Sequence, residues 1–533
     1  MSDSAVTDPF AELLKRAAQV KLFVTSCESL NLQDEWVFEV HGLPIPEDTE
    51  TEGTSVELFL QRARRADVGF NVTTSVFPAN VRICQLVDGM PLGIEIAAGW
   101  VRTLTCEEIV YEIERGLDIL HASARDLPGR HRSMRAVFDH SWKLLNEDEQ
   151  LVLCQLSVFR GGFKREAAEL VANVSLSTLV SLVTKSLIRR SGSGRYDLHE
   201  LIRQYALERL AEQPEILKES QACHATFYMT ILGGEDERLR GSEQQNSLNE
   251  LAVDMDNILA AWDWAIKQRK YELIRRAARS IGLFFEAAGL FQEGIEQLEP
   301  LVQALHSELR NDELYKLLGL ALLQQGLLYF RKGQFVRAEG CYKESIAVLR
   351  STSDQALLAD ALTFLGIITY LNGEYAQSRN LLGEGLECAR ASNAKWFEAY
   401  AIHSLGYIDS LMGDYQKGHE RMLAGLDMWR VIGDPHYIAL GLNFLTPTII
   451  KLGDYEEATA FVWESITLCE KAKNRWRMGT AYRYLGSVSL AEGQYAEAQA
   501  HFHNSLEVFG EYTEGWDIAL SWYYLGTIWE RLP

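Results

Sequence analysis

Eight cysteines and the closely spaced His501 and His503 are the residues of this 533-residue chain whose types could bind a metal or carry redox chemistry. Their spacing argues against both. No two cysteines come closer than 22 residues, which excludes CxxC-type pairs and favours buried, reduced thiols. Two histidines that are two residues apart on a helix point in different directions. We therefore expect no metal site.

Sequence motifs for catalysis are also missing. The chain contains no Gly-x-x-x-x-Gly-Lys-Ser/Thr loop, and the dipeptide Gly-Lys does not occur. Without that loop there is neither a backbone cradle for phosphates nor a lysine for their β- and γ-oxygens. A Gly-x-Ser-x-Gly elbow and a His-Glu-x-x-His motif are absent as well. The sequence predicts no catalytic residue and no enzymatic activity.

Composition places the chain among ordinary globular proteins, with 47% hydrophobic and 24% charged residues. Its length predicts roughly three or four domains. No apolar run approaches the length of a membrane span, and the N-terminus lacks the features of a secretory signal, so a cytoplasmic location is expected. The net charge of −22 opposes binding to DNA or anionic membranes. We expect no direct nucleic-acid or membrane partner.

The strongest pattern is a strict 40-residue period in the C-terminal part. The turn triplet Gly333-Gln334-Phe335 returns with its glycine at positions 373, 413, 453 and 493. Seven residues before each turn glycine stands a small residue, and Gly526 continues this second series: Gly326, Gly366, Gly406, Thr446 and Gly486. A fixed period of this size is typical of stacked helical hairpins. The last hairpin of the series is cut in half at Pro533.

The small residues indicate how the two helices of each hairpin pack. A glycine in the first helix lowers helix propensity by about 1 kcal/mol, but it lets the second helix cross closely. The pattern of Leu365-Gly366 in a first helix and Gly413-Asp414-Tyr415 at a turn resembles the tetratricopeptide repeat over residues 315–533. The 40-residue period resembles the elongated repeats of bacterial regulators related to the maltose-regulon activator. Residues 282–300 look like one further, irregular hairpin.

Such repeats present the inner face of their first helices to a partner. The functional interpretation is a groove for a protein or peptide, or for a small-molecule effector; the alternative is packing between repeats. Pro447 falls inside a first helix, where a local kink is expected. Counted from the glycines, the inner face should include Tyr370, Tyr400, His403, Tyr407, Asn443, Arg483 and Tyr523.

The first 123 residues read as a short strand at 21–26 followed by a helical bundle over 53–122. The segment from Cys84 to Ala98 contains Gly89-Met90-Pro91-Leu92, which resembles the Gly-Leu-Pro-Leu motif of NB-ARC modules in the STAND class of signalling ATPases. This resemblance implies that Pro91 occupies the position that lies against the adenine of a bound nucleotide.

Residues 124–212 predict helices followed by a β-hairpin with a Ser191–Gly194 tip, as in a winged helix. By the resemblance, this domain packs against the nucleotide module rather than reading DNA. Leu198-His199-Glu200 is similar to the family's Met-His-Asp motif, whose histidine reaches the β-phosphate of ADP. Here Glu200 replaces aspartate, and the alternative is a surface or helix-capping histidine.

The resemblance identifies the chain as the C-terminal part of a STAND regulator without a phosphate-binding loop. Cys27 stands where relatives carry the arginine that senses the γ-phosphate, which argues against ATP sensing. We expect a mainly α protein: an NB-ARC remnant (1–123), a winged helix (124–212), a helical connector (213–310) and a repeat solenoid (311–533). The expected function is non-catalytic recognition without a cofactor. Two alternatives stay open: a regulator that binds ADP or ATP only when a separate polypeptide supplies the loop, and a fragment of a disrupted gene.

Overall fold

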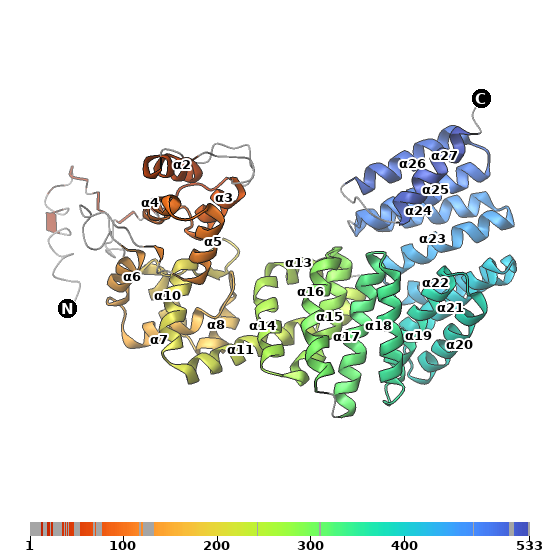
Figure 1. The fold of residues 1–533 in the computed structure, drawn as a ribbon, viewed down its shortest axis with the longest axis horizontal. Helices are drawn as coiled ribbons and strands as arrows, with labels where there is room; N and C mark the ends of the chain where they lie inside the picture. The colour runs from red at the N-terminus through yellow and green to blue at the C-terminus, as the bar shows by residue number, and fades with distance from the viewer. Residues whose placement is uncertain are drawn as a thin grey trace. The chain divides into compact units, whose positions relative to one another are not determined.

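The computed structural model describes residues 54–530 apart from 68–69, 71–76, 117–118, 121–132, 242, 309–310, 473 and 511–515, together with short stretches between residues 12 and 46. The chain divides into an N-terminal unit, Met1–Phe227, and a C-terminal unit, Tyr228–Pro533. Both consist mainly of α-helices (Figure 1), which confirms the predicted fold class. The finer domain boundaries at residues 123, 212 and 310 stay predictions.

The N-terminal unit begins with a helical bundle. Helix α2 packs against α4, and α3 packs against α5, through residues such as Phe59 and Ile83, which are fully buried. The bounds are α2 (Thr54–Ala66), α3 (Phe77–Leu86), α4 (Pro91–Gly99), η1 (Trp100–Arg102) and α5 (Cys106–Arg115). Of the strand expected at 21–26, Lys21, Phe23 and Val24 are described and form no strand; the other positions, and Cys27, lie outside the described residues.

Helices and a β-hairpin make up the second part of this unit. Strands β1 (Arg189–Arg190) and β2 (Tyr196–Asp197) pair antiparallel around the Ser191–Gly194 tip, as the sequence predicted. The ring of Phe163 stacks on those of Phe159 and Tyr196, which anchors the hairpin to the helices. The helices are α6 (Met134–Trp142), α7 (Glu147–Leu156), α8 (Arg165–Ala172), α9 (Leu176–Thr184), α10 (Glu200–Ala211) and α11 (Pro214–Gly233), the last of which runs across the unit boundary.

The C-terminal unit is an array of helical hairpins that stack in sequence order (Figure 1). It opens with α12 (Asp236–Arg240), α13 (Gln244–Val253) and α14 (Met255–Lys267). The hairpins follow as α15 (Tyr271–Ala288) with α16 (Phe291–His306), α17 (Asp312–Arg331) with α18 (Phe335–Leu349), α19 (Gln355–Leu371) with α20 (Tyr375–Ala391), α21 (Lys395–Leu411) with α22 (Tyr415–Ile432), α23 (Pro435–Leu452) with α24 (Tyr455–Lys471), α25 (Arg475–Ala491) with α26 (Tyr495–Phe509), and then α27 (Trp516–Trp529).

The periodic glycines do what their spacing predicted. The turn glycines from Gly333 to Gly493 all adopt positive φ, between 77° and 94°, which ends the first helix of each hairpin in the left-handed conformation. The crossing glycines lie under a bulky residue of the second helix. A Cβ atom on Gly366 would come within 2.7 Å of Leu382 Cγ, and one on Gly406 within 2.8 Å of the backbone oxygen of Gly418. Pro447 lies inside α23, which continues to Leu452.

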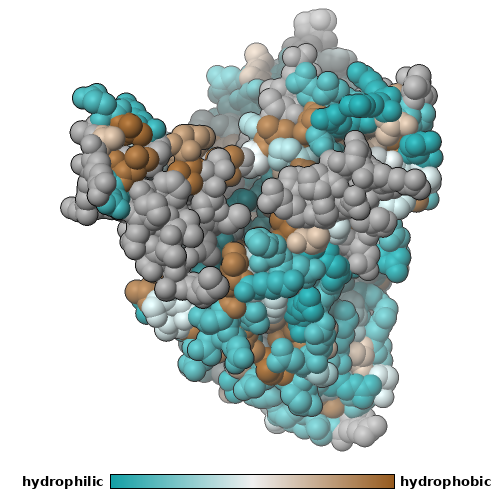
Figure 2. All heavy atoms as spheres, turned by 90° about the vertical axis from the view of Figure 1, so that its left-hand side faces the viewer, coloured by the Kyte–Doolittle hydropathy of each residue, from teal (hydrophilic) through white to brown (hydrophobic). Residues whose placement is uncertain are grey.

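Burial distinguishes the two helices of a hairpin. The second helices bury one stripe, whereas first helices such as α19 and α23 are buried on nearly every side. On the face shown in Figure 2, hydrophilic side chains dominate among the described residues and hydrophobic ones are scattered. No single described helix is long and apolar enough to cross a membrane, although α8 and α9 together pass the same length and composition test as a pair bent by 107°.

Candidate functional site

Polar side chains from four first helices of the C-terminal unit meet inside the solenoid. The carboxylate of Glu286 (α15) accepts a hydrogen bond from Arg331 Nε (α17) at 2.7 Å, and Nη2 of the same arginine lies 2.6 Å from the same Oε1 atom. Arg331 Nη2 also donates to the hydroxyl of Tyr437 (α23) at 3.3 Å. His436 Nε2 lies 3.7 Å from Glu286 Oε1 and 3.0 Å from Nη2 of Arg477 (α25). We call these five residues the interior cluster.

Burial governs the electrostatics of the interior cluster. The side chains of Glu286, Arg331 and His436 are 6%, 12% and 8% exposed. Burial drives the pKa of His436 well below its ordinary value, and the neighbouring guanidinium groups add to this effect, so the ring is neutral. Burial alone would lower the pKa of Arg331, but Glu286 outweighs it and raises the pKa. The cluster therefore contains two guanidinium groups and one carboxylate.

Arg477 is the unbalanced member of the interior cluster. The residue is 7% exposed, and its Nε atom is buried without a hydrogen-bond partner. Its polar side-chain neighbour is the neutral ring of His436, and burial followed by repulsion from Arg331 lowers the pKa of its guanidinium. A buried cation without a directly paired anion is costly. Among the described residues, no carboxylate lies within ion-pair distance of it.

A second group of buried charges nearby is balanced. Arg279 Nη1 lies 3.3 Å from Asp360 Oδ2, and Arg240 Nε lies 3.5 Å from Asp236 Oδ1. The guanidinium of Arg240 also stands 5.2 Å from the ring centroid of Trp396, within the range of a cation–π contact. Two cations thus face two carboxylates. The charge excess of the interior lies at Arg477.

Aromatic rings surround these charges. Tyr437 packs against Trp396, Tyr400 and Trp429, with ring centroids 4.4–5.6 Å apart. Asp434 caps α23 by accepting the backbone N–H groups of His436 and Tyr437, and it accepts the Trp396 indole N–H at 3.3 Å. Burial raises the pKa of Asp434 to about 7. The interior thus combines packed aromatic rings with a few charged groups.

The residues predicted to line the groove fall into two groups. Tyr523 is 64% exposed, whereas the others are largely buried between first helices. Tyr400 stands beside the interior cluster, 5.4 Å from the ring of Tyr437. His403 lies against the backbone oxygen of Gly441 at 3.3 Å, and burial lowers the pKa of its ring to about 4.

The remaining predicted groove residues extend this buried layer. Tyr370 and Tyr407 contact each other with ring centroids 5.4 Å apart. Arg483 pairs with Asp517 at 2.9 Å. Both amide atoms of Asn443 are buried without a hydrogen-bond partner. Whether any of these residues binds a partner stays a prediction.

Sequence reasoning missed the whole interior cluster, although one signal was available for Arg477. The register nine residues before each crossing small residue is occupied by Leu317, Leu357, Phe397 and Tyr437, and then by Arg477. A charge at a register that is otherwise apolar or aromatic marks a position whose side chain does more than pack. The partners of Arg477 carried no such signal.

In the N-terminal unit, the structure brings together the two segments predicted to contact a nucleotide. Asp88 and Gly89 form a turn with φ values of 49° and 64°, after which Pro91 starts α4. Asp88 Oδ2 lies 3.7 Å from His199 Nε2 and 2.6 Å from Arg189 Nη2.

The role that the geometry gives His199 is helix capping. Its Nδ1 atom accepts the backbone N–H of Leu201 at 3.0 Å, at the start of α10. Because Nδ1 accepts, the proton of the neutral ring lies on Nε2, facing Asp88. Burial lowers the pKa of His199 to about 4. This is the capping alternative considered above, and a contact of Pro91 or His199 with a nucleotide stays a prediction.

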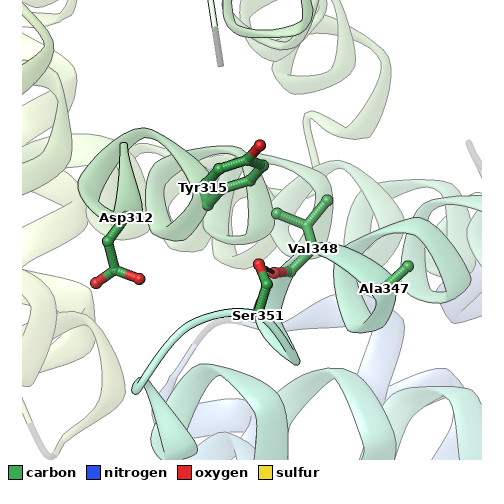
Figure 3. A pocket seen from close by; sticks show the side chains of 5 residues that line it. All are labelled: Asp312, Tyr315, Ala347, Val348 and Ser351. Carbon is green, nitrogen blue, oxygen red and sulfur yellow. Dashed lines mark hydrogen bonds between the residues drawn. The ribbon is translucent and has the colours of Figure 1, made fainter. Parts of the chain in front are cut away.

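An open hollow of about 440 Å³ lies between the start of α17 and the end of α18. Figure 3 shows Tyr315 beside Val348 and Ser351, while the Asp312 carboxylate and Ala347 point away. The Ser351 hydroxyl donates to the backbone oxygen of Val348. Because no charged groups converge on it, this hollow is a weaker candidate than the interior cluster.

The described residues hold no group of three or more His, Cys, Asp or Glu side chains that could bind a metal. The described cysteines are free, and burial raises the pKa of Cys84 and of Cys154 to about 12. A thiol with such a pKa is a poor nucleophile at neutral pH.

Comparison with known proteins agrees with this architecture. A tetratricopeptide-repeat family model matches residues 317–391. Over 98% of its length, the chain superposes on 67% of a solved STAND protein with a tetratricopeptide repeat sensor from Pyrococcus horikoshii, with a TM-score of 0.52 and 17% identity. Residues 317–391 thus match the tetratricopeptide repeat, and the chain shares its fold with this STAND protein, as the resemblance implied.

Two curated relatives come from Mycobacterium tuberculosis. The chain is 29% identical over 302 residues to a protein named as an HTH-type transcriptional regulator. The aligned region covers 55% of this chain and 33% of the relative. It is 30% identical over 214 residues to an uncharacterized protein, covering 38% of this chain and 53% of the relative. The chain therefore spans about a third to a half of the length of these relatives.

Proposed function

We propose that this chain is a non-catalytic recognition module whose solenoid binds a protein, a peptide or a small effector. The observation that carries this proposal is the interior cluster. Desolvating an ion costs several kcal/mol, and apolar residues of similar volume often pack at least as stably as a buried ion pair. A cluster of two arginines, one glutamate and one histidine is therefore a poor way to stabilise the fold, but it is well suited to binding a ligand.

The position of the interior cluster suits a sensor. Its members come from hairpins that lie far apart in the sequence, from Glu286 to Arg477, so a ligand that contacts them would bear on the packing of several hairpins at once. The repeats of the Pyrococcus protein are named as a sensor, and the mycobacterial relative is named as a regulator of transcription; both roles come to this chain as proposals. With a net charge of −22, the chain is proposed to act without contacting nucleic acid itself.

A second candidate is a nucleotide-switched regulator completed by a separate polypeptide that carries the phosphate-binding loop. The observation that favours it is the approach of the Asp88–Pro91 turn to His199. It predicts that ADP is retained only when that polypeptide is present, and that His199→Ala releases it.

The test is a melting-temperature screen of the full chain against peptides, sugars, organic acids, ADP and ATP, followed by calorimetric titration of each hit. We expect a hit from a class other than nucleotides and no ATP hydrolysis. Tyr437→Phe removes only the hydroxyl that accepts from Arg331, and it should weaken binding several-fold. The matched control, Tyr455→Phe at the start of α24, should bind as the wild type does.

Two results would contradict the proposal. One is a screen in which nothing raises the melting temperature of the folded chain. The other is binding of ADP or ATP by the chain alone that depends on Pro91 and His199, which would transfer the function to the nucleotide module.

A further inference from the structure

We propose that the interior cluster is a carboxylate-binding site in which Arg477 receives an anionic group of the effector. This inference rests on the proposed function and gives its ligand a chemical class. Its basis is the charge count: Glu286 accepts a hydrogen bond from Arg331 Nε and lies 2.6 Å from its Nη2, whereas among the described residues the side-chain partner of Arg477 is the neutral ring of His436.

The imbalance at Arg477 is local. Elsewhere in the interior, Arg279 pairs with Asp360, Arg240 lies beside Asp236, and Arg483 pairs with Asp517 at 2.9 Å. Each of these guanidinium groups has a carboxylate of its own. Arg477 is buried to the same degree as Arg483, at 7% and 5% exposure, yet its Nε donor is unused. The fold therefore leaves one positive charge and at least one donor for a group that no described residue supplies.

The geometry of a guanidinium selects the kind of group. Its planar fork of donors matches the two oxygens of a carboxylate, which it binds in a bidentate manner. The aromatic wall of Trp396, Tyr400 and Tyr437 next to the cluster can hold the apolar part of such a ligand. A free organic acid and the C-terminus of a peptide share this chemistry, and the experiment separates them.

Glu286 is the internal competitor of the ligand. It is the carboxylate of the cluster, and its Oε1 atom lies 3.7 Å from the His436 Nε2 that contacts Arg477. A negative ligand at Arg477 would be repelled by Glu286 while Glu286 stays charged. Glu286→Gln keeps the shape of the side chain and removes this charge, so it should strengthen carboxylate binding.

The experiment is calorimetric titration of the full chain at constant ionic strength with four probes: sodium succinate, the peptide Gly-Gly-Phe, its C-terminal amide, and inorganic phosphate. We expect succinate, Gly-Gly-Phe or both to bind, and the amide not to bind. Arg477→Gln should weaken binding tenfold or more, the scale of a charge-assisted hydrogen bond. Glu286→Gln should strengthen it several-fold. Arg475→Gln, an exposed arginine on the same helix, should leave it unchanged.

Each outcome decides the proposal. Binding of succinate alone assigns the site to free acids, and binding of Gly-Gly-Phe but not of its amide assigns it to a peptide C-terminus. The proposal is overturned if no carboxylate binds the wild type, if phosphate alone binds, or if Arg477→Gln binds carboxylates as the wild type does. If circular dichroism shows that Arg477→Gln does not fold, the proposal is tested by two other measurements. These are carboxylate binding by the wild type and the expected increase in carboxylate affinity in Glu286→Gln.

Failure of this inference differs from failure of the proposed function. If an uncharged or cationic hit from the screen binds and depends on Tyr437, the solenoid is a recognition module and the carboxylate assignment is wrong. If nothing binds the folded chain at all, the proposed function and the carboxylate assignment are both wrong.

Discussion

Breaking the ion pair between Arg331 and Glu286 should reveal how strongly the solenoid interior isolates charge from water. Removing one partner of a buried pair costs about 3–5 kcal/mol, because the remaining charge stays buried without compensation. In Arg331→Met, Glu286 retains the more distant guanidinium of Arg477, so we expect a loss of about 3 kcal/mol in the free energy of unfolding. In the double variant Arg331→Met/Glu286→Gln no buried carboxylate is left without a partner. Its loss in the free energy of unfolding should therefore be smaller than the sum of the losses in Arg331→Met and Glu286→Gln.

The matched control is an exposed pair of the same residue types. Arg430 and Glu464 lie 2.9 Å apart on the second helices α22 and α24, with side chains 38% and 40% exposed. Water screens such a pair, so Arg430→Met should cost about 1 kcal/mol or less. Any larger cost would show that packing of the arginine stem, rather than its charge, dominates these substitutions.

Urea unfolding of the full chain, followed by tryptophan fluorescence, measures these differences. Trp396, whose ring lies 4.4 Å from that of Tyr437, is one of the 12 tryptophans that contribute to this signal. Midpoints are compared among variants whose transitions have equal slopes, since a changed slope would mean that the array no longer unfolds in the same way. The reasoning is refuted if Arg331→Met costs no more than Arg430→Met, or if the losses in the double variant are additive within about 0.5 kcal/mol.

Three further predictions concern packing and pH. Gly406→Ala should destabilise by about 1–3 kcal/mol because its Cβ would lie 2.8 Å from backbone atoms, whereas Gly340→Ala, in open space on α18, should stabilise by about 0.5–1 kcal/mol; urea midpoints with the opposite order would contradict this. Because the pKa of His403 is lowered, its contribution to the free energy of unfolding is present above about pH 6.5 and is lost as the pH falls toward 4, by up to about 3 kcal/mol. His403→Gln should therefore reduce the loss of stability in acid when unfolding is measured from pH 7.5 to 4. The control His503→Gln, at an exposed position, should not. The raised pKa of Asp434 has the opposite sign, because its contribution is present below about pH 4 and lost as pH rises toward 7; Asp434→Asn should therefore gain stability relative to the wild type over this range, and a constant difference would refute the shift.

The repeat architecture could be predicted from the sequence because it depends on single residues at fixed positions. A turn that needs positive φ selects glycine, and Gly333 and Gly373 have that conformation. A close helix crossing excludes a side chain, and Gly366 and Gly406 lie where a Cβ would collide. Each of these requirements is local to one hairpin and recurs in the next, so a period in the sequence reports it directly.

The interior cluster could not be predicted in the same way. The period gives the register of a residue on its own helix, but it does not say which residue faces it from another turn of the solenoid. Arg331 and Tyr437 are 106 positions apart, and Arg279 and Asp360 are 81 apart. Such pairs form because several first helices converge, and each pair occurs once. Similarly, His199 could be assigned to a motif, but only the structure shows its Nδ1 atom capping α10.

The array separates positions that maintain the fold from positions that are free to specify a ligand. The crossing register is held to small residues, Gly366, Gly406, Thr446 and Gly486, because a larger one would push two helices apart. The register nine residues earlier is also largely buried, but it accepts side chains of different size and chemistry: along successive hairpins it changes from Leu317 and Leu357, through aromatic residues, to Arg477 and Asp517. Asp517 is neutralised within the array by Arg483, whereas no described carboxylate pairs with Arg477. Variation at a register that accepts residues of different chemistry, including one buried arginine without a described carboxylate partner, is what a repeat scaffold needs in order to recognise a particular anion without changing its fold.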